Sequence, residues 1–227
     1  MKRTALTFIA FIACNWAMAQ NFISPNGAEN AGSQPAINIA VISTKVSNAD
    51  KQMELAEFNE QMGDLSGAIT LYKKAAEEYN ADKKYNKYGS VLLKISALLL
   101  EQENYNEAEQ VVLKSALKNY SKIGSRNGQM LSYNMLGRIY FAANKLTQSM
   151  WFYTQQGILA QQLNNQSIYL DSVLGIADIK IKKKEFGLAS KDLLRAEELA
   201  KASNLLQYNQ RIRVSKSVLT EKSKGKS

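Results

Sequence analysis

The stretch from Leu136 to Tyr153, LGRIYFAANKLTQSMWFY, carries the pattern on which the fold prediction rests. Two runs of large apolar residues at helical spacing contain the small residues Gly137 and Ser149, and the polar joint from Ala143 to Lys145 separates the runs. Residues three or four apart lie on one face of a helix. The stretch therefore predicts two consecutive helices that cross at their small residues.

The same arrangement recurs along the chain at a nearly constant period. The small residue of the second helix falls at Ala68, Ala108, Ser149 and Ala189, so successive positions are 40, 41 and 40 residues apart. Flanking positions also repeat: small residues twelve before (Ala56, Ser96, Gly137, Ala177), and large apolar residues thirteen before (Leu55, Ile95, Leu136, Ile176), ten before (Phe58, Leu98, Ile139, Ile179), three before (Leu65, Tyr105, Leu146, Phe186) and four after (Tyr72, Val112, Tyr153, Leu193). Such a helix pair buries its apolar stripes only by stacking on the next pair. The sequence predicts an all-α array of about four antiparallel helix pairs.

This set of residues resembles the tetratricopeptide repeat (TPR) family. The best single match is the third unit, where the family's Leu-Gly-x-x-Tyr and small-x-x-x-aromatic patterns are followed by Leu136, Gly137, Tyr140, Leu146, Ser149 and Tyr153. The resemblance covers roughly residues 49–202 and implies a TPR-like α-solenoid, a right-handed superhelical array. Helical hairpins of another repeat class are the alternative.

The chain departs from the family pattern in three ways. The family period is 34 residues, so each unit here carries about six more, which we expect longer helices and longer turns between units to absorb. The proline that usually closes a unit is missing, because the chain contains only Pro25 and Pro35. Positions that are normally apolar hold Gln52, Asn59 and Lys180.

A C-terminal capping helix is expected from Leu205 to Leu219. Its polar residues Asn209, Arg211 and Arg213 suit the open end of a stack, where no further unit covers the last helix. The repeat domain is therefore predicted over residues 49–220, followed by a disordered basic tail at residues 221–227.

The first 19 residues read as a signal peptide. Lys2 and Arg3 give a positive start, the segment Thr4–Ala13 is almost wholly apolar, and Ala17 and Ala19 form the small-x-small pattern of a cleavage site after Ala19. Two alternatives remain open: an uncleaved membrane anchor, although the apolar run is about half the roughly 20 residues that a bilayer requires, and lipid attachment at Cys14. We therefore expect an exported protein, periplasmic or secreted.

Residues 20–48 are rich in Asn, Ser, Gly, Ala and Pro and show no helical period, which predicts a flexible leader. The segment Ile37–Val46 is an exception. It is apolar enough to form a short strand or a docking segment, and we expect it to pack on the first helix pair.

The composition argues against catalysis. Histidine is absent and Cys14 is the only cysteine, so triads, Cys-His dyads and zinc sites lack their residues. The acidic neighbours Glu77–Glu78 and Glu197–Glu198 read as solvated helix faces, since adjacent residues on a helix do not face each other. Trp151 and Tyr153 are expected in the core. The sequence predicts no enzyme, no cofactor and no metal site.

The chain is basic, with a formal net charge of +9. Nucleic acid is not expected as a partner, because an exported protein rarely meets it and the lysines are not interleaved with stacking aromatic residues. The densest basic run, Lys180 with Lys182, Lys183 and Lys184, is expected to cap the end of a helix. No stretch after the signal peptide is long and apolar enough for a stable membrane span in the mature chain.

In the TPR family, a concave groove lined by the first helices binds a peptide or a partner helix. The matching positions are Met53, Glu57, Glu60, Leu93, Ala97, Leu100, Asn134, Arg138, Phe141, Leu174 and Asp178. This groove is apolar in its middle and acidic at both ends, which favours an apolar or basic guest. The carboxylate clamp of some family members is not carried over, because its positions hold Met53, Glu57, Lys94, Leu131 and Met135.

These patterns predict a non-catalytic protein–protein interaction scaffold or adaptor outside the cytoplasm, with a protein or peptide partner. The alternative is a sensing module of an envelope signalling system, because units of about 40 residues resemble the arrays that precede the membrane helix in some bacterial sensors.

Overall fold

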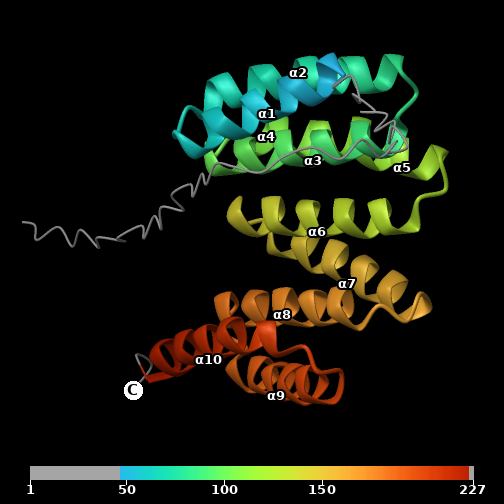
Figure 1. Ribbon diagram of the computed structural model, residues 1–227. Helices are drawn as coiled ribbons and strands as arrows, with labels where there is room; N and C mark the ends of the chain where they lie inside the picture. Colours follow the sequence, from blue (N-terminus) through green and yellow to red (C-terminus); the bar gives the residue numbers. More distant parts are fainter. Residues whose placement is uncertain (1–46, 225–227) are drawn as a thin grey trace, which may run out of the picture. The chain divides into compact units, whose positions relative to one another are not determined.

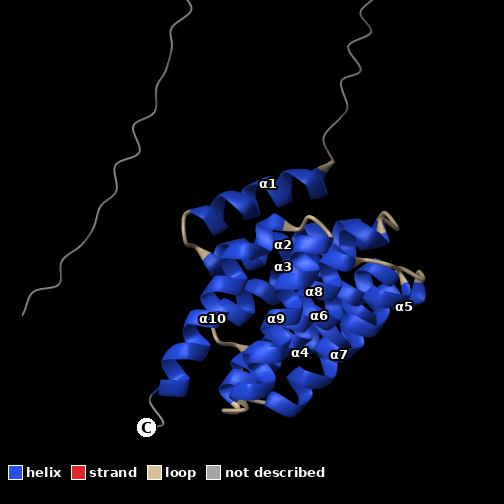
Figure 2. Ribbon diagram, turned by 90° about the horizontal axis from the view of Figure 1, so that it is seen from below, coloured by secondary structure: helices blue, strands red, loops and turns tan. Residues whose placement is uncertain are grey.

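A computed structural model describes residues 47–224, and these residues form an all-helical array without strands (Figures 1 and 2). The elements in order are α1 (Asn48–Gln61), α2 (Leu65–Ala81), α3 (Tyr85–Glu101), α4 (Tyr105–Gln110), η1 (Val111–Leu117), α5 (Lys118–Lys122), α6 (Arg126–Ala142), α7 (Leu146–Gln162), α8 (Gln166–Lys182), α9 (Phe186–Ala202), η2 (Leu206–Tyr208) and α10 (Asn209–Lys224). Consecutive helices pack against each other, as predicted for stacked helix pairs. The all-α repeat fold is therefore confirmed.

Several predictions fall outside the described residues. These are the signal peptide, the lipid site at Cys14 and the docking segment Ile37–Val46. Where the described residues begin and end, they extend slightly beyond the predicted domain. Helix α1 begins at Asn48, and α10 continues to Lys224, so part of the predicted tail is helical.

Eight turns of three residues each join the helices of the described residues. Several of them are seen as tan segments in Figure 2. The middle residue of every turn has a positive φ: Gly63, Lys83, Glu103, Gly124, Asn144, Asn164, Lys184 and Asn204. The residue after it donates its N–H to a carbonyl five positions back, for example Lys84 to Tyr79 at 2.8 Å, which satisfies the last turn of the helix. Turns between units are as short as turns within them. The expectation of longer turns between units was wrong, and the extra residues lie in helices of 17 residues.

One helix is longer than its counterparts. The second helix of unit 2 runs without interruption through α4, η1 and α5, from Tyr105 to Lys122, and is one residue longer than the 17-residue helices. Its middle, Val111–Leu117, is a π-helix, the form that a helix adopts when it accommodates an inserted residue. This explains why the period between Ala108 and Ser149 is 41 rather than 40.

The small residues lie at the helix crossings as predicted. Ala68, Ala108, Ser149 and Ala189 are completely buried. The hydroxyl of Ser149 donates to the carbonyl oxygen of Gly137 at 2.7 Å, so a side chain of α7 contacts the backbone of α6 directly. The ring of Tyr153 lies between two glycines of neighbouring first helices: an added Cβ would come within 2.9 Å of it at Gly137 and within 2.7 Å at Gly175. The glycines therefore admit an aromatic ring between α6 and α8.

The first helix lacks the cover that later units have. Leu55 and Phe58 are 52% and 53% exposed, whereas the matching Ile95 and Leu98 of unit 2 are almost completely buried. Helix α2 packs on that face of α3, while the described residues provide no helix before α1. The oxygen Oε1 of Gln52 is buried without a hydrogen-bond partner in the described chain.

Three further side chains differ from expectation. Trp151 is 53% exposed rather than in the core, whereas Tyr153 is buried as predicted. Lys180, at a normally apolar position, is half-buried and pairs with Asp192 at 2.6 Å. Arg211 does not cap an open end but turns back to the acidic residues of α8. No helix in residues 47–224 is long and apolar enough to cross a membrane.

Candidate binding groove

The first helices of successive units lie side by side and line two large cavities. Helix α3 packs against α6, α6 against α8, and α8 against α10, which takes the place of a first helix after the fourth unit. One cavity, of about 630 Å³, lies between α3 and α6. The other, of about 690 Å³, lies between α6, α8 and α10. We call these the α3–α6 cavity and the α6–α10 cavity, and the two together the groove.

The α3–α6 cavity has an apolar floor with amide groups around it. Its lining includes the predicted residues Leu93, Ala97, Asn134 and Arg138. Other lining residues are polar but uncharged, among them Asn86, Ser90 and Asn127, and its charged groups are Lys94 and Arg138. Side-chain amides both donate and accept hydrogen bonds, so this lining suits the backbone of an extended chain.

The α6–α10 cavity is more apolar and carries the other two predicted residues that line the groove, Phe141 and Asp178. The lysine Lys182 lies over the ring of Phe141, with Nζ 4.7 Å from the ring centroid, and donates to its carbonyl oxygen at 3.1 Å. This lysine was expected only to cap α8, but it forms part of the cavity wall. Arg138 and Phe141 are three residues apart on α6, so one helical face connects the two cavities.

Five predicted groove residues line neither cavity. Met53 and Leu100 are half-buried and pack on the core. Glu57 pairs with Lys94 at 3.1 Å, and Glu60 accepts a hydrogen bond from the hydroxyl of Tyr72 at 2.7 Å. Leu174 is completely buried in a core cluster with Leu170, Leu193 and Ile212, so the prediction that it faces the groove was wrong.

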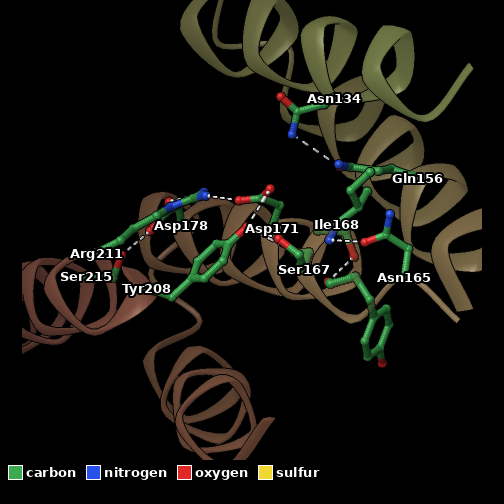
Figure 3. A network of polar contacts seen from close by, with 12 residues as sticks. Asn134, Gln156, Asn165, Ser167, Ile168, Asp171, Asp178, Tyr208, Arg211 and Ser215 are labelled. Carbon is green, nitrogen blue, oxygen red and sulfur yellow. Dashed lines mark hydrogen bonds and ion pairs between the residues drawn. The ribbon is translucent and has the colours of Figure 1, made fainter. Parts of the chain in front are cut away.

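A polar network holds α10 against α8 (Figure 3). The guanidinium of Arg211 reaches Asp171 at 2.8 Å and Asp178 at 3.9 Å. The hydroxyl of Tyr208 donates to Asp171 at 3.0 Å, and that of Ser215 donates to Asp178 at 2.8 Å. Burial raises the pKa of both aspartates above its usual value, and these partners oppose that rise. The network therefore uses both acidic groups of α8 internally.

Sequence reasoning missed this network, although the repeat register contained a signal for it. Asp171 and Asp178 are seven residues apart and share one helical face. Arg211 lies forty residues after Asp171, at the matching position of the next unit. The ion pair between Asp171 and Arg211 therefore joins matching positions of two neighbouring first helices.

The groove holds no constellation that points to catalysis. Within residues 47–224, no cluster of three His, Cys, Asp or Glu side chains is placed to hold a metal ion. The shifted pKa values of buried groups have structural causes. Burial, for example, raises the pKa of Tyr153 to about 12, and its ring is packed between two glycines.

Comparisons with known proteins agree with this architecture. The family model of soluble NSF attachment protein (SNAP) matches residues 17–127. No curated protein sequence matches the chain. The crystal structure of the apo form of RapI is similar, with a TM-score of 0.68 and 11% identity over 82% of this chain and 69% of RapI.

Two other solved structures are similar. A Rap protein complexed with Competence and Sporulation Factor has a TM-score of 0.67 and 15% identity, and the match covers 80% of this chain and 53% of that protein. A Podosopora anserina putative kinesin light chain with nearly identical TPR-like repeats has a TM-score of 0.54 and 13% identity, over 78% of this chain and 95% of the other. The period, the buried crossings and these likenesses agree: the described residues have a tetratricopeptide-like repeat fold.

Proposed function

We propose that this protein is a non-catalytic scaffold that holds a segment of a partner protein in the groove along its first helices. The observation that carries the proposal is the pair of cavities, about 630 and 690 Å³, which are lined by Arg138 and Phe141, respectively, on the same helix α6. Each is within the size range of ligand-binding cavities. Aromatic and arginine side chains at the centre of an interface are also the most frequent binding hot spots.

Two further points support binding rather than catalysis. The similar Rap protein was solved in complex with another factor, although this chain spans only about half of its length. The groove also offers apolar area, amides and cations, which bind a chain without activating a nucleophile. The same geometry would serve a sensing module, our second candidate, which the likeness to Rap proteins in apo and complexed forms supports.

We also propose that the protein works outside the cytoplasm, on the evidence of its first 19 residues. The test is to express the full chain in a bacterium, fractionate the cells and determine the N-terminus of the protein. Export predicts a chain that begins at Gln20, in the periplasm or medium. A chain that keeps its first residues in the cytoplasmic fraction would contradict export.

Partner capture tests the groove. The chain from Gln20 onward serves as bait for an envelope extract, in three forms: unchanged, Arg138→Ala/Phe141→Ala, and the control Leu206→Ala/Arg213→Ala. The control removes one exposed apolar side chain and one arginine outside both cavities. We expect the central pair to abolish capture and the control to retain it. Capture that survives the central change, or is lost in the control, would place the binding surface elsewhere.

A scaffold and a sensing module differ in what binding does to the array. A sensing module must change between two arrangements when its ligand binds. Small-angle scattering of the free and bound protein would show such a change. An unchanged scattering curve favours the scaffold.

A further inference from the structure

The charged groups of the groove are strongly unbalanced. Five cations line the two cavities, namely Lys94, Arg138, Lys182, Arg211 and Lys222, against the single acid Asp178. That acid accepts a hydrogen bond from Ser215 and lies near Arg211. The groove therefore presents no uncommitted carboxylate to a guest.

The acidic residues near the groove are also neutralised within the chain. Glu57, expected to make one end of the groove acidic, pairs with Lys94. Asp171, on α8, binds Arg211 and Tyr208. The sequence prediction of acidic ends and an apolar or basic guest rested on Glu57, Glu60 and Asp178. In the structure Glu57 pairs with Lys94, Glu60 accepts a hydrogen bond from Tyr72, and Asp178 accepts one from Ser215.

Three of the cations have no such partner. Within residues 47–224, neither Arg138, Lys182 nor Lys222 forms an ion pair with a carboxylate. Lys182 is instead held over Phe141, and Arg138 extends from the exposed side of α6 at the edge of the α3–α6 cavity. Unpaired cations around an apolar cavity attract an opposite charge and disfavour a like charge.

From this imbalance we infer that the groove selects an acidic, apolar segment of a partner protein, and that Arg138 is the main side chain that pairs with the acidic group of this segment. The inference rests on the proposed function, because it names the class of guest that the groove holds. A guest carboxylate pairs bidentately with the planar guanidinium of Arg138, which fixes both charge and orientation. Leucine-like side chains of the guest occupy the apolar floor next to Phe141, and the asparagine amides of the α3–α6 cavity meet its backbone.

The test uses three nonapeptides, acetylated and amidated at their ends, in which leucine and serine alternate. Two central positions hold glutamate, glutamine or lysine, so the peptides differ only in charge at these positions. Binding to the full mature chain is measured by isothermal titration calorimetry. We expect the glutamate peptide to bind at least about tenfold more tightly than the lysine peptide, and its affinity to fall as salt is raised.

The variant Arg138→Gln keeps a polar side chain and removes the charge. It should weaken the glutamate peptide about tenfold, which is the size expected for loss of one hydrogen-bonded charge pair, and leave the glutamine peptide nearly unchanged. Arg213→Gln is the matched control, because Arg213 is an exposed arginine that lines neither cavity. It should shift binding by less than about twofold.

The outcomes separate the preference for an acidic guest from peptide binding itself. If the glutamine or lysine peptide binds as well as the glutamate peptide, the acidic preference is overturned while peptide binding stands. If none of the three peptides binds, the proposed function is contradicted as well. A nine-nucleotide oligothymidylate is tested in parallel, and tighter binding of it than of the glutamate peptide would assign the groove to nucleic acid and overturn the inference.

Discussion

Replacing Gly128 with alanine should destabilise the array, although alanine is the better helix former. Gly128 lies in α6, where an ideal Cβ would come within 2.0 Å of the ring of Tyr120. That ring cannot move away freely, because a Cβ at Gly89 of α3 would also lie 2.5 Å from it, and Tyr120 is only 4% exposed. Overpacking of this kind costs about 1–3 kcal/mol, and the alanine returns about 0.5–1 kcal/mol of helix propensity. The net loss is then up to about 2.5 kcal/mol, and about 1 kcal/mol at the midpoints of the two ranges.

The midpoint loss should lower the melting temperature by about 2–5 °C, and the upper limit by up to about 10 °C, measured by circular dichroism at 222 nm. The control is Gly187→Ala in α9, where an added Cβ meets no atom within 4 Å. This change should leave the melting temperature unchanged or raise it slightly. If both variants melt at or above the temperature of the unchanged protein, Tyr120 is not clamped between α3 and α6, and the packing argument is refuted.

Four other predictions concern other parts of the array. Lys87, together with the hydroxyl groups of Ser47 and Tyr79, holds the pKa of Asp50 well below its usual value of 3.8. The stabilisation of the fold by ionised Asp50 is therefore present above about pH 4 and is lost as the pH falls further. Thermal melts between about pH 5 and 3 should show a smaller fall in melting temperature for Asp50→Asn than for the unchanged protein. Arg211→Leu leaves the two aspartates of α8 half-buried without their cation, so hydrogen exchange in α10 should accelerate and stability should fall by about 1–3 kcal/mol, less than for a fully buried pair because the arginine is 39% exposed. Deletion of Ser115 should convert the π-helix into a regular α-helix with no loss of melting temperature, and a loss of several degrees would show that the extra residue is required. Gly137→Leu should lower the melting temperature more than Gly128→Ala, because the larger leucine side chain would meet the ring of Tyr153, which lies only 2.9 Å from an ideal Cβ at Gly137.

The sequence predicted most of the fold because one helix pair repeats four times. A period of 40 residues placed Ala68, Ala108, Ser149 and Ala189 at the crossings, and all four are buried there. The turns were less predictable. Their middle residues include Lys83, Glu103 and Lys184, which have no intrinsic preference for positive φ, so helix packing rather than residue type imposes the conformation.

The candidate site was only partly predictable. Arg138, Phe141 and Asp178 were assigned to the groove by register, and they line the two cavities. Leu174 occupies an equivalent position but is buried, because the core of unit 4 and the incoming α10 enclose it. The predicted groove differs from the observed one most in its charge. Register alone does not tell whether Glu57 is free or paired with Lys94, since the pairing depends on side-chain reach between neighbouring helices.

The π-helix in the second unit also bears on how such an array changes over evolutionary time. An inserted residue in a regular helix rotates everything after it by about 100°, which would turn every later side chain to a new face. Here the extra residue is absorbed within Val111–Leu117, and the turn after Lys122 has the same three residues as its counterparts. The π-helix Val111–Leu117 therefore keeps the effect of a one-residue insertion within the helix that carries it. Arg138 and Phe141, downstream of the insertion, line the cavities at the positions that register assigns to them.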